Sequence, residues 1–354
     1  MSGDGMVLVT GGAGFIGSNL VDRLAGQGRR VMVYDLLARP GVERNLEWLV
    51  SRHGDLIQPI IADVRDHERL ANVAGKAGAV FHMAAQVAVT TSMVDPLEDH
   101  QINVGATFAL LEALRRKDDR TPIVFASTNK VYGDLADIPL ELIDGAYQPA
   151  DPQVRDHGIG EDRPLDFHTP YGCSKGAADQ YVLDYARSFG VPSCVFRMSC
   201  IYGPRQMGTE DQGWVAHFAI RALEGRKIIL FGDGRQVRDI LHVRNAVDAY
   251  MAALHNVERL AGRAFNLGGG PANAVSLRQI LAHIETLAGR PLDIDFDDWR
   301  PGDQRYFVAD CRRARAELGL ADPLGWREGV ADLISWLESE RPAIDRPALA
   351  GAAA

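Results

Sequence analysis

Cysteine is scarce in this sequence, and the few cysteines present form no pattern. The 354 residues include four of them, Cys173, Cys194, Cys200 and Cys311, with no C-x-x-C pair and no histidine at zinc-finger spacing. A disulfide framework or a zinc site depends on such spacing, so neither is indicated and we predict no metal. Unpaired thiols are typical of a reducing compartment, which favours the cytoplasm.

The sequence also lacks long hydrophobic runs. The first apolar run, residues 6–9, starts too early to follow the basic and hydrophobic regions of a signal peptide, and no later run has the length of a membrane span. We therefore predict no membrane partner.

Positive charge is not in excess. Lys and Arg number 38 against 47 Asp and Glu, for a net charge of -9, and the signs are mixed along the chain. We therefore predict no nucleic-acid partner. What the chain does have is 46% hydrophobic residues, enough for the core of one large domain or two coupled ones.

Short apolar runs alternate with amphipathic stretches over the first two thirds of the chain. The amphipathic stretches include residues 14–28 and 103–116. The apolar runs lie at residues 6–9, 31–34, 56–61, 79–81, 123–125 and 193–196. This alternation predicts an α/β protein of Rossmann type, with a doubly wound parallel sheet that is buried on both faces.

The pattern changes at about residue 200, where Gly-rich turns and short segments predict a smaller C-terminal α/β lobe for the substrate. We place the larger domain at residues 1–198, with 239–260 returning to it, and the smaller lobe mainly at 199–345. Residues 346–354 show no periodicity and are predicted to form a disordered tail.

A glycine-rich segment, VTGGAGFIGSNL, follows the first predicted strand and opens the first helix. Gly11, Gly14 and Gly17 allow a tight turn, a close approach of the backbone to a pyrophosphate, and close helix packing. The helix N-terminus offers amide donors to phosphate. These glycines could serve a structural turn alone, but their place at the start of a βαβ unit favours a dinucleotide site.

Asp35 ends the second predicted strand. A carboxylate there accepts hydrogen bonds from both ribose hydroxyls and repels a 2′-phosphate, so we predict NAD rather than NADP as cofactor. Arg39 is close enough to weaken that preference, and Asp35 could instead cap a helix. Asp63, after the third strand, is a candidate for the adenine amino group, with capping of its own loop as the alternative.

Tyr171 and Lys175 are four residues apart and therefore share one face of a helix. A tyrosine loses its proton only near pH ~10. A fixed ammonium group, together with the positive charge of an oxidised nicotinamide, would lower that pKa and make Tyr171 a base for a substrate hydroxyl. The alternative is an amphipathic helix with Tyr171 buried and Lys175 in solvent.

Several motifs together resemble one family. The segments TGGAGFIG, HMAAQ, INVGAT, STNKVYG and YGCSK are similar to those of the extended short-chain dehydrogenase/reductases, the NAD-dependent sugar-nucleotide epimerases and dehydratases. The resemblance covers residue 6 to about residue 336.

The resemblance implies roles for further residues. Thr128, with Ser127, would hold the reacting oxygen of the sugar beside Tyr171. Contacts to NAD are implied for the three glycines, Asp35, Asp63, Tyr171 and Lys175, and also for Phe15, Ile16, Val64, Ala84 and Ala85. Contacts to the substrate are implied for Gln86, Thr90, Asn129, Arg238 and Arg300.

Four residues near the expected substrate or nicotinamide have alternative roles. Arg238 and Arg300 correspond to the pyrophosphate-binding arginines of the family, and each could instead form a surface ion pair. Asn129 could hold a neighbouring sugar hydroxyl or cap the following turn. His82 would line the nicotinamide or sugar pocket, or would be only a packed loop residue.

Asn129 and Lys130 stand where the dehydratases of the family carry an acidic pair. Elimination of water needs an acid and a base, so the resemblance implies oxidation and reduction at one carbon instead. The segments STNKVYGDL and DQGWV, with residues 165–187, are most similar to the subfamily of 2-epimerases that act on CDP-paratose and CDP-tyvelose. We therefore expect an NAD-dependent nucleotide-sugar epimerase that inverts C2 of a CDP-deoxyhexose. The alternatives are a UDP-sugar 4-epimerase and a non-catalytic NAD-binding regulator.

The expected partners are a CDP- or UDP-sugar and a second copy of the chain. Helices at residues 97–116 and 171–189 correspond to those of a four-helix dimer interface in the family, which implies a homodimer. Residues 136–167 are long for a simple connection, so we expect a lid or a sugar-specific loop there.

Overall fold

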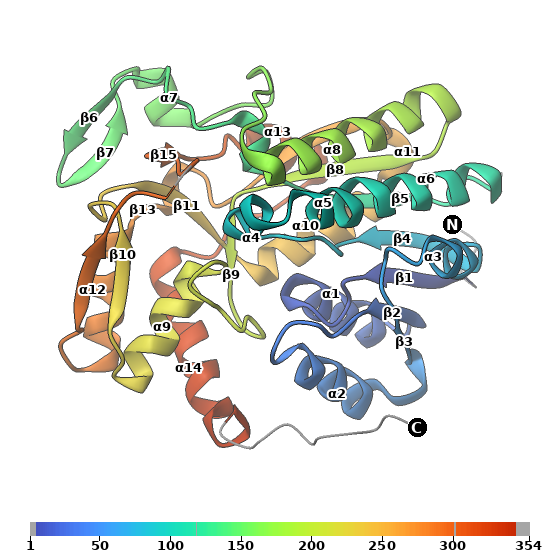
Figure 1. Cartoon of the computed structure of the whole chain (residues 1–354), viewed down its shortest axis with the longest axis horizontal. Helices are drawn as coiled ribbons and strands as arrows, with labels where there is room; N and C mark the ends of the chain where they lie inside the picture. The colour runs from blue at the N-terminus through green and yellow to red at the C-terminus, as the bar shows by residue number, and fades with distance from the viewer. Residues whose placement is uncertain (1–4, 118, 301, 345–354) are drawn as a thin grey trace.

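A seven-stranded sheet lies at the centre of the computed structural model, which describes residues 5–117, 119–300 and 302–344. Every neighbouring pair of its strands is parallel, in the order β12-β8-β5-β4-β1-β2-β3 (Figure 1). Its strands are β1 (Met6–Thr10), β2 (Val31–Asp35), β3 (Ile57–Ile61), β4 (Ala77–His82), β5 (Ile123–Thr128), β8 (Ser193–Met198) and β12 (Arg263–Leu267). The predicted fold class is confirmed.

Helices cover both faces of this sheet. One face carries α1 (Phe15–Gly26), α2 (Val42–His53) and α10 (Val243–His255). The other carries α3 (His67–Ala74), α6 (Ala106–Lys117) and α8 (Thr169–Phe189). Because both faces are buried, inner strands such as β1 and β5 are buried along almost their whole length rather than at alternate positions.

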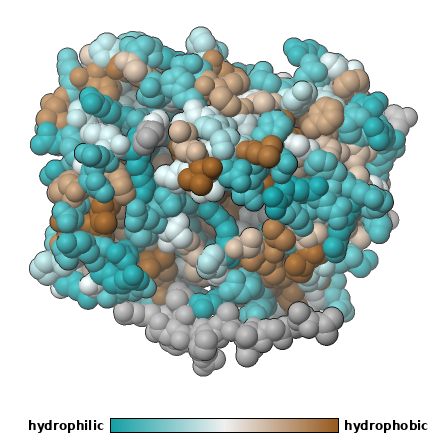
Figure 2. Space-filling view, viewed as in Figure 1, coloured by the Kyte–Doolittle hydropathy of each residue, from teal (hydrophilic) through white to brown (hydrophobic). Residues whose placement is uncertain are grey.

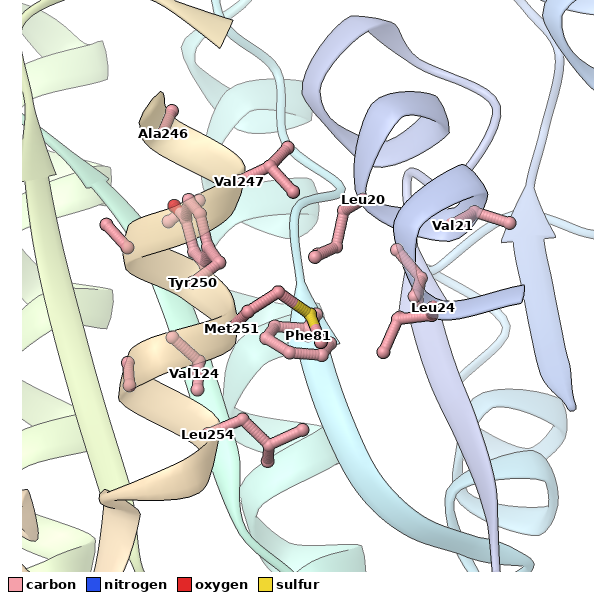
Figure 3. Packing of buried hydrophobic residues seen from close by; sticks show 14 of the residues in the cluster. Leu20, Val21, Leu24, Phe81, Val124, Ala246, Val247, Tyr250, Met251 and Leu254 are labelled. Carbon is pink, nitrogen blue, oxygen red and sulfur yellow. The ribbon is translucent and has the colours of Figure 1, made fainter. Parts of the chain in front are cut away.

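Figure 3 shows how the first layer packs. Leu20 and Leu24 of α1 and Met251 of α10 lie around Phe81 of β4. The Phe81 and Tyr250 rings meet edge to face, with 6.2 Å between their centroids. This packing joins α10 to the larger domain, although α10 comes after the first segments of the smaller lobe in the sequence.

The smaller lobe has its own core and small sheets. Its elements are β9 (Cys200–Tyr202), α9 (Trp214–Glu224), β10 (Ile228–Phe231), β11 (Val237–His242), η4 (Pro271–Asn273), β13 (Ala274–Ser276), α12 (Leu277–Ala288), β14 (Ile294–Asp297), β15 (Tyr306–Phe307) and α14 (Trp326–Ile344). β10 pairs with β14, and β11 pairs with β9, β13 and β15. The domain boundaries stay a prediction, and the predicted tail lies outside the described residues.

The segment expected to be a lid forms an antiparallel hairpin, β6 (Leu140–Ile143) and β7 (Ala146–Pro149), followed by α7 (Pro152–His157). The hairpin is bound to the smaller lobe, because the Tyr147 hydroxyl donates to Asp233 at 2.7 Å. None of the residues 136–167 lines the cavity described below, so the structure does not place a lid there.

Three 3-10 or π-helical segments and four short α-helices complete the described chain. They are η1 (Gly54–Leu56), α4 (Val89–Val94), α5 (Pro96–His100), the π-helix η2 (Gln101–Gly105), η3 (Asn129–Tyr132), α11 (Val257–Leu260) and α13 (Arg312–Leu318). Among the described residues, no helix combines the length and the apolar character needed to cross a membrane.

Candidate active site

A large cavity lies where the carboxyl ends of the sheet strands face the smaller lobe. Its volume is about 890 Å³, within the size range of small-molecule sites. The residues predicted to bind cofactor or substrate all line it: Gly11, Gly14, Phe15, Ile16, Gly17, Asp35, Asp63, Val64, Ala84, Ala85, Gln86, Thr90, Ser127, Thr128, Asn129, Tyr171, Lys175, Arg238 and Arg300. The structure thus brings them together, and their individual roles stay predictions.

The turn between β1 and α1 requires glycine. Gly11 has a φ of 66°, and a Cβ there would lie 2.8 Å from the backbone nitrogen of Ala84. A Cβ on Gly17 would overlap with the carbonyl oxygen of Gly11. The N-cap residue of α1, Gly14, has no side chain to satisfy the first helical amides. These amides are therefore available to a phosphate group.

Asp35 lies beside this turn at the end of β2. Its carboxylate accepts hydrogen bonds from the backbone nitrogens of Ala13 at 3.0 Å and Leu37 at 2.9 Å. Burial raises the pKa of Asp35, while these two hydrogen bonds act in the opposite direction. Asp35 caps neither flanking helix, because the N-cap residues of α1 and α2 are Gly14 and Gly41.

Asp63 is bound within its own loop. Its carboxylate accepts from the backbone nitrogen of Arg65 at 2.8 Å and from the Arg65 Nε at 2.9 Å. This is the loop-capping alternative, and a contact with adenine stays a prediction. Arg39 also lines the cavity, in the loop that follows Asp35.

Among the buried polar atoms of the cavity wall that have no partner within the described chain are Oδ1 of Asn45 and Oγ1 of Thr90. Buried polar atoms are nearly always hydrogen-bonded, so both are available to a bound molecule. With the glycine turn, the uncapped helix N-terminus and the Asp35 carboxylate, the residues present fit a dinucleotide.

Helix α8 presents Tyr171 and Lys175 to the cavity, one turn apart and both buried. The Lys175 ammonium group donates to the carbonyl oxygen of Ala126 at 2.6 Å. It also lies 4.3 Å from the centroid of the Phe125 ring. The alternative in which Lys175 points into solvent is therefore wrong.

Burial dominates the ionisation of both groups. It raises the pKa of Tyr171 to about 12, against a hydrogen bond with Thr128. It lowers the pKa of Lys175 to about 7, against the negative charges of Asp179 and Asp99. The expected lowering of the Tyr171 pKa is thus not found in the free protein, because burial outweighs the hydrogen bond with Thr128 and the charge of Arg39. That expectation also included the charge of an oxidised nicotinamide.

The two hydroxyl groups at the end of β5 have different surroundings. Ser127 donates to the buried carboxylate of Asp179 at 2.8 Å, and Asp179 is also paired with Arg197 at 3.0 Å. Thr128 accepts from the backbone nitrogen of Lys130 at 3.2 Å. The Ser127 hydroxyl is therefore already hydrogen-bonded within the buried Asp179–Arg197 pair. Thr128 is the stronger candidate to hold the reacting oxygen.

Asn129 links the two lobes. Its Nδ2 donates to Oε1 of Gln304 at 3.0 Å, and Gln304 in turn donates to the carbonyl oxygen of Gly133 at 2.6 Å. The capping alternative for Asn129 is wrong, because Thr128 is the residue that caps η3. A contact between Asn129 and a sugar hydroxyl stays a prediction.

Both predicted pyrophosphate arginines face the cavity from the smaller lobe. Arg238 is buried and donates to Asp303 at 2.7 Å. Arg300 donates to Glu210 at 3.0 Å and stacks on Phe231, with its guanidinium carbon 3.7 Å from the ring centroid. They form ion pairs, but within the cavity wall rather than on an open surface.

The loop after β4 is held by Asn103, a residue that the sequence reasoning did not select. Asn103 lies in the π-helix η2, and its amide donates to the carbonyl oxygen of Gln86 at 3.1 Å and to Ser174 at 3.0 Å. It belongs to the segment INVGAT, which contributed to the family resemblance but suggested no role. Gln86 also donates to Asp99 at 3.0 Å.

His82 lies behind the cavity and does not line it. Its ring nitrogens are hydrogen-bonded to the hydroxyls of Thr10 at 2.6 Å and Thr107 at 3.0 Å. Burial lowers the pKa of His82 to about 3, so the ring is neutral. The packed alternative for His82 is therefore correct.

Comparisons with known proteins agree with this site. Residues 7–268 match the NAD dependent epimerase/dehydratase family. The chain is 40% identical over 342 residues to the CDP-paratose 2-epimerase of Salmonella typhi, covering 94% of this chain and 99% of that protein. It is 33% identical to the UDP-glucose 4-epimerase of Mycolicibacterium smegmatis, covering 94% and 98%.

A solved structure shows the same similarity. The UDP-glucose 4-epimerase of Thermus thermophilus, in complex with NAD, is 30% identical and superimposes with a TM-score of 0.77 over 94% of this chain and 99% of that chain. The family match spans most of the chain and contains the glycine turn, Asp35 and the Tyr171–Lys175 pair. The chain therefore belongs to the NAD-dependent epimerase/dehydratase family, and it is an enzyme whose cofactor is NAD.

Proposed function

We propose that the enzyme inverts C2 of a CDP-deoxyhexose of the CDP-paratose and CDP-tyvelose type. The observation that carries this proposal is the pair that follows Thr128: Asn129 and Lys130 line the cavity beside Tyr171, where an elimination would need carboxyl groups. The 40% identity to a CDP-paratose 2-epimerase supports the same reaction and substrate class.

Tyr171 would accept the proton of the C2 hydroxyl. The Thr128 hydroxyl is hydrogen-bonded to Tyr171 and stabilises the phenolate that accepts this proton. A protonated Lys175, one helical turn away, favours the phenolate by its charge. Both groups are buried, so little water screens their interaction.

Bound NAD would supply the redox chemistry by accepting a hydride from the sugar carbon and returning it. The chain's part is to retain the keto-sugar and to let its ring turn over before the hydrogen returns to the opposite face. Gly302 and Asp303 of the smaller lobe line the cavity together with Gln86 and Thr90 of the larger domain, so the sugar would lie between residues of both lobes. Tyr171 would then give the proton back to the oxygen.

A UDP-sugar 4-epimerase is the second candidate, favoured by the 33% identity to the UDP-glucose 4-epimerase of Mycolicibacterium smegmatis. That reaction needs the same Tyr171 and Lys175 but a different orientation of the sugar. A non-catalytic regulator would have no need for a buried Tyr–Lys pair.

The test is incubation of the purified enzyme with separate CDP-, UDP-, GDP- and dTDP-sugars, with the products identified by NMR. Inversion at C2 of a CDP-deoxyhexose is the expected result. Inversion at C4 of a UDP-sugar would establish the second candidate, and a 4-keto-6-deoxy product would contradict both.

We also infer that the enzyme is a homodimer. Helices α4, α5, α6 and α8 leave an apolar surface exposed, which we call the α4–α8 face: Val94, Leu97, Phe108, Tyr181 and Phe189. Val94 is 86% exposed and Leu97 66%. Figure 2 shows one side of the molecule, where hydrophobic residues gather in small groups among hydrophilic ones. A second copy covering the α4–α8 face would remove these side chains from water.

A further inference from the structure

Lys130 is a partly buried cation in the cavity wall, with 22% of its side chain exposed, and the reaction described above does not use it. It lies in η3, directly after β5, and its ammonium group donates to the carbonyl oxygen of Gly302 at 3.0 Å. An ammonium group has three N–H donors. The bond to Gly302 therefore leaves donors that can serve a ligand.

A second cation faces the same point from the other lobe. Arg238 of β11 donates to Oδ1 of Asp303 at 2.7 Å, and the Lys130 nitrogen lies 3.9 Å from the same oxygen. Two positive groups thus share one carboxylate at the junction of the lobes. The excess positive charge in a partly dehydrated wall favours an anionic ligand, and a diphosphate is the anionic part of a nucleotide sugar.

Lys130 follows Thr128 by two residues, so its positive charge lies near the proposed catalytic residues. Its backbone nitrogen donates to the Thr128 hydroxyl at 3.2 Å, and Thr128 is hydrogen-bonded to Tyr171. In a nucleotide sugar the phosphate is attached to C1, so C2 is the adjacent carbon, while C4 lies across the ring. A phosphate bound near Thr128 therefore brings C2, not C4, toward Tyr171.

We infer that Lys130 binds the sugar-linked phosphate of the substrate together with Arg238, and that this contact selects C2 as the reacting carbon. The inference rests on the proposed function, because it takes the substrate to be a nucleotide sugar. It assigns Lys130 a role in substrate binding and in the choice of carbon, apart from proton transfer.

The pKa of Lys130 predicts how diphosphate binding should depend on pH. Burial, with a smaller contribution from the charge of Arg238, lowers the pKa of Lys130 to about 8, against the opposing effects of Asp303, Cys200 and Asp134. A diphosphate binds the charged form of Lys130, so its binding should weaken as the pH rises from about 7 to about 9. The last pKa of the diphosphate is about 6, so it is mostly ionised at pH 7 and gains negative charge as the pH rises, and its own titration cannot cause the weakening.

The test is calorimetric titration of wild-type enzyme and Lys130→Gln with CDP and with cytidine, at about pH 7 and about pH 9. Glutamine keeps an N–H donor for the Gly302 carbonyl but carries no charge. Lys227→Gln is the matched control, because Lys227 pairs with Asp295 at 3.2 Å outside the cavity. Thermal unfolding and NAD content would confirm that each variant is folded.

We expect Lys130→Gln to bind CDP about tenfold to a hundredfold more weakly than wild type at the lower pH. The CDP affinity of Lys130→Gln should not vary with pH, and its affinity for cytidine should equal that of wild type. Lys130→Arg should recover part of the CDP affinity. Equal CDP binding by wild type and Lys130→Gln would overturn the inference about Lys130 but not the proposed function. If wild type did not bind CDP, the proposed CDP-sugar substrate would fail as well.

The proposed role of Lys130 in selecting C2 is tested by turnover at saturating substrate. With saturating CDP-sugar, turnover at C2 by Lys130→Gln should remain below that of wild type, since the phosphate no longer fixes the ring. Wild-type turnover at saturation would show that Lys130 adds affinity only, and would overturn its role in selecting C2.

Discussion

At the residue scale, the chemistry depends on a tyrosine and a lysine whose pKa values burial shifts toward the neutral forms. Burial raises the pKa of Tyr171 to about 12 and lowers that of Lys175 to about 7. The spacing of the two residues was enough to predict their shared helix face. The direction of these shifts was not readable from the sequence, because it depends on how deeply α8 packs against β5.

Tyr171→Phe should lower kcat by about 10²- to 10⁴-fold, the range of a lost general acid–base group, while the protein still folds and retains NAD. Steady-state kinetics and the NAD content of the purified variant are the measurements. Tyr181→Phe is the control, since Tyr181 lies on the same helix but is 42% exposed and outside the cavity. Near-normal turnover by Tyr171→Phe would remove Tyr171 from the mechanism.

Lys175→Met should abolish most activity and should change how stability depends on pH. Lys175 has a pKa of about 7 in the folded chain. An unfolded lysine titrates near ~10.4, so wild type gains stability as the pH rises from about 7 toward about 10. The methionine variant lacks this gain. As the pH rises, the unfolding free energy of wild type should therefore increase relative to that of the variant.

Urea unfolding of both proteins at about pH 7 and about pH 9 measures that difference. Other titrating groups are common to the two proteins and cancel in the comparison. A difference that does not vary with pH would mean that Lys175 keeps an ordinary pKa in the folded enzyme.

At the scale of elements, the turn between β1 and α1 brings the sheet and the cofactor site together. Gly17→Ala would place a Cβ against the Gly11 carbonyl oxygen, so the turn must shift. We expect weaker NAD binding and a loss of roughly 1–3 kcal/mol of stability, as for other overpacked sites. Isothermal titration and thermal unfolding measure the two effects.

Gly26→Ala is the matched control in the same helix, because a Cβ on Gly26 would have no atom within 4 Å. It should leave NAD binding unchanged and be neutral or slightly stabilising. If Gly17→Ala behaved like Gly26→Ala, the close packing of this turn would not be what the site requires.

The elements that the sequence predicted are those with a strong local signal. Six strands of the central sheet coincide with the predicted apolar runs. The strand β12 was missed, since RAFNL is short and polar at one end and becomes a strand only by pairing with β8. The π-helix that positions Asn103 has no periodic signature, so its support of the Gln86 loop required the structure.

At the scale of the whole molecule, the site depends on contacts between segments far apart in the sequence. Asn129 meets Gln304, and Lys130 meets Gly302, across more than 170 residues. The sequence could select Asn129 and Lys130 as unusual, but not their partners, because no local pattern connects them.

If the α4–α8 face is the dimer interface, a charge placed on it should prevent dimer formation. Leu97→Asp should convert the expected dimer to a monomer, because it would bury an unpaired charge in the interface. Light scattering measures the mass. Leu142→Asp is the control, since Leu142 is 51% exposed on the β6–β7 hairpin, away from that face. A monomeric wild-type enzyme at working concentrations would contradict the proposed dimer.

The most direct test of the proposed reaction follows a deuterium atom placed at C2 of a CDP-deoxyhexose. If Tyr171 handles only the hydroxyl proton, and Asn129 and Lys130 perform no elimination, the hydrogen that leaves C2 returns to C2 without exchange with water. NMR of the product should then show inversion at C2 with the deuterium retained and no solvent hydrogen on any carbon. Loss of the label to water, or a 4-keto-6-deoxy product, would contradict the account.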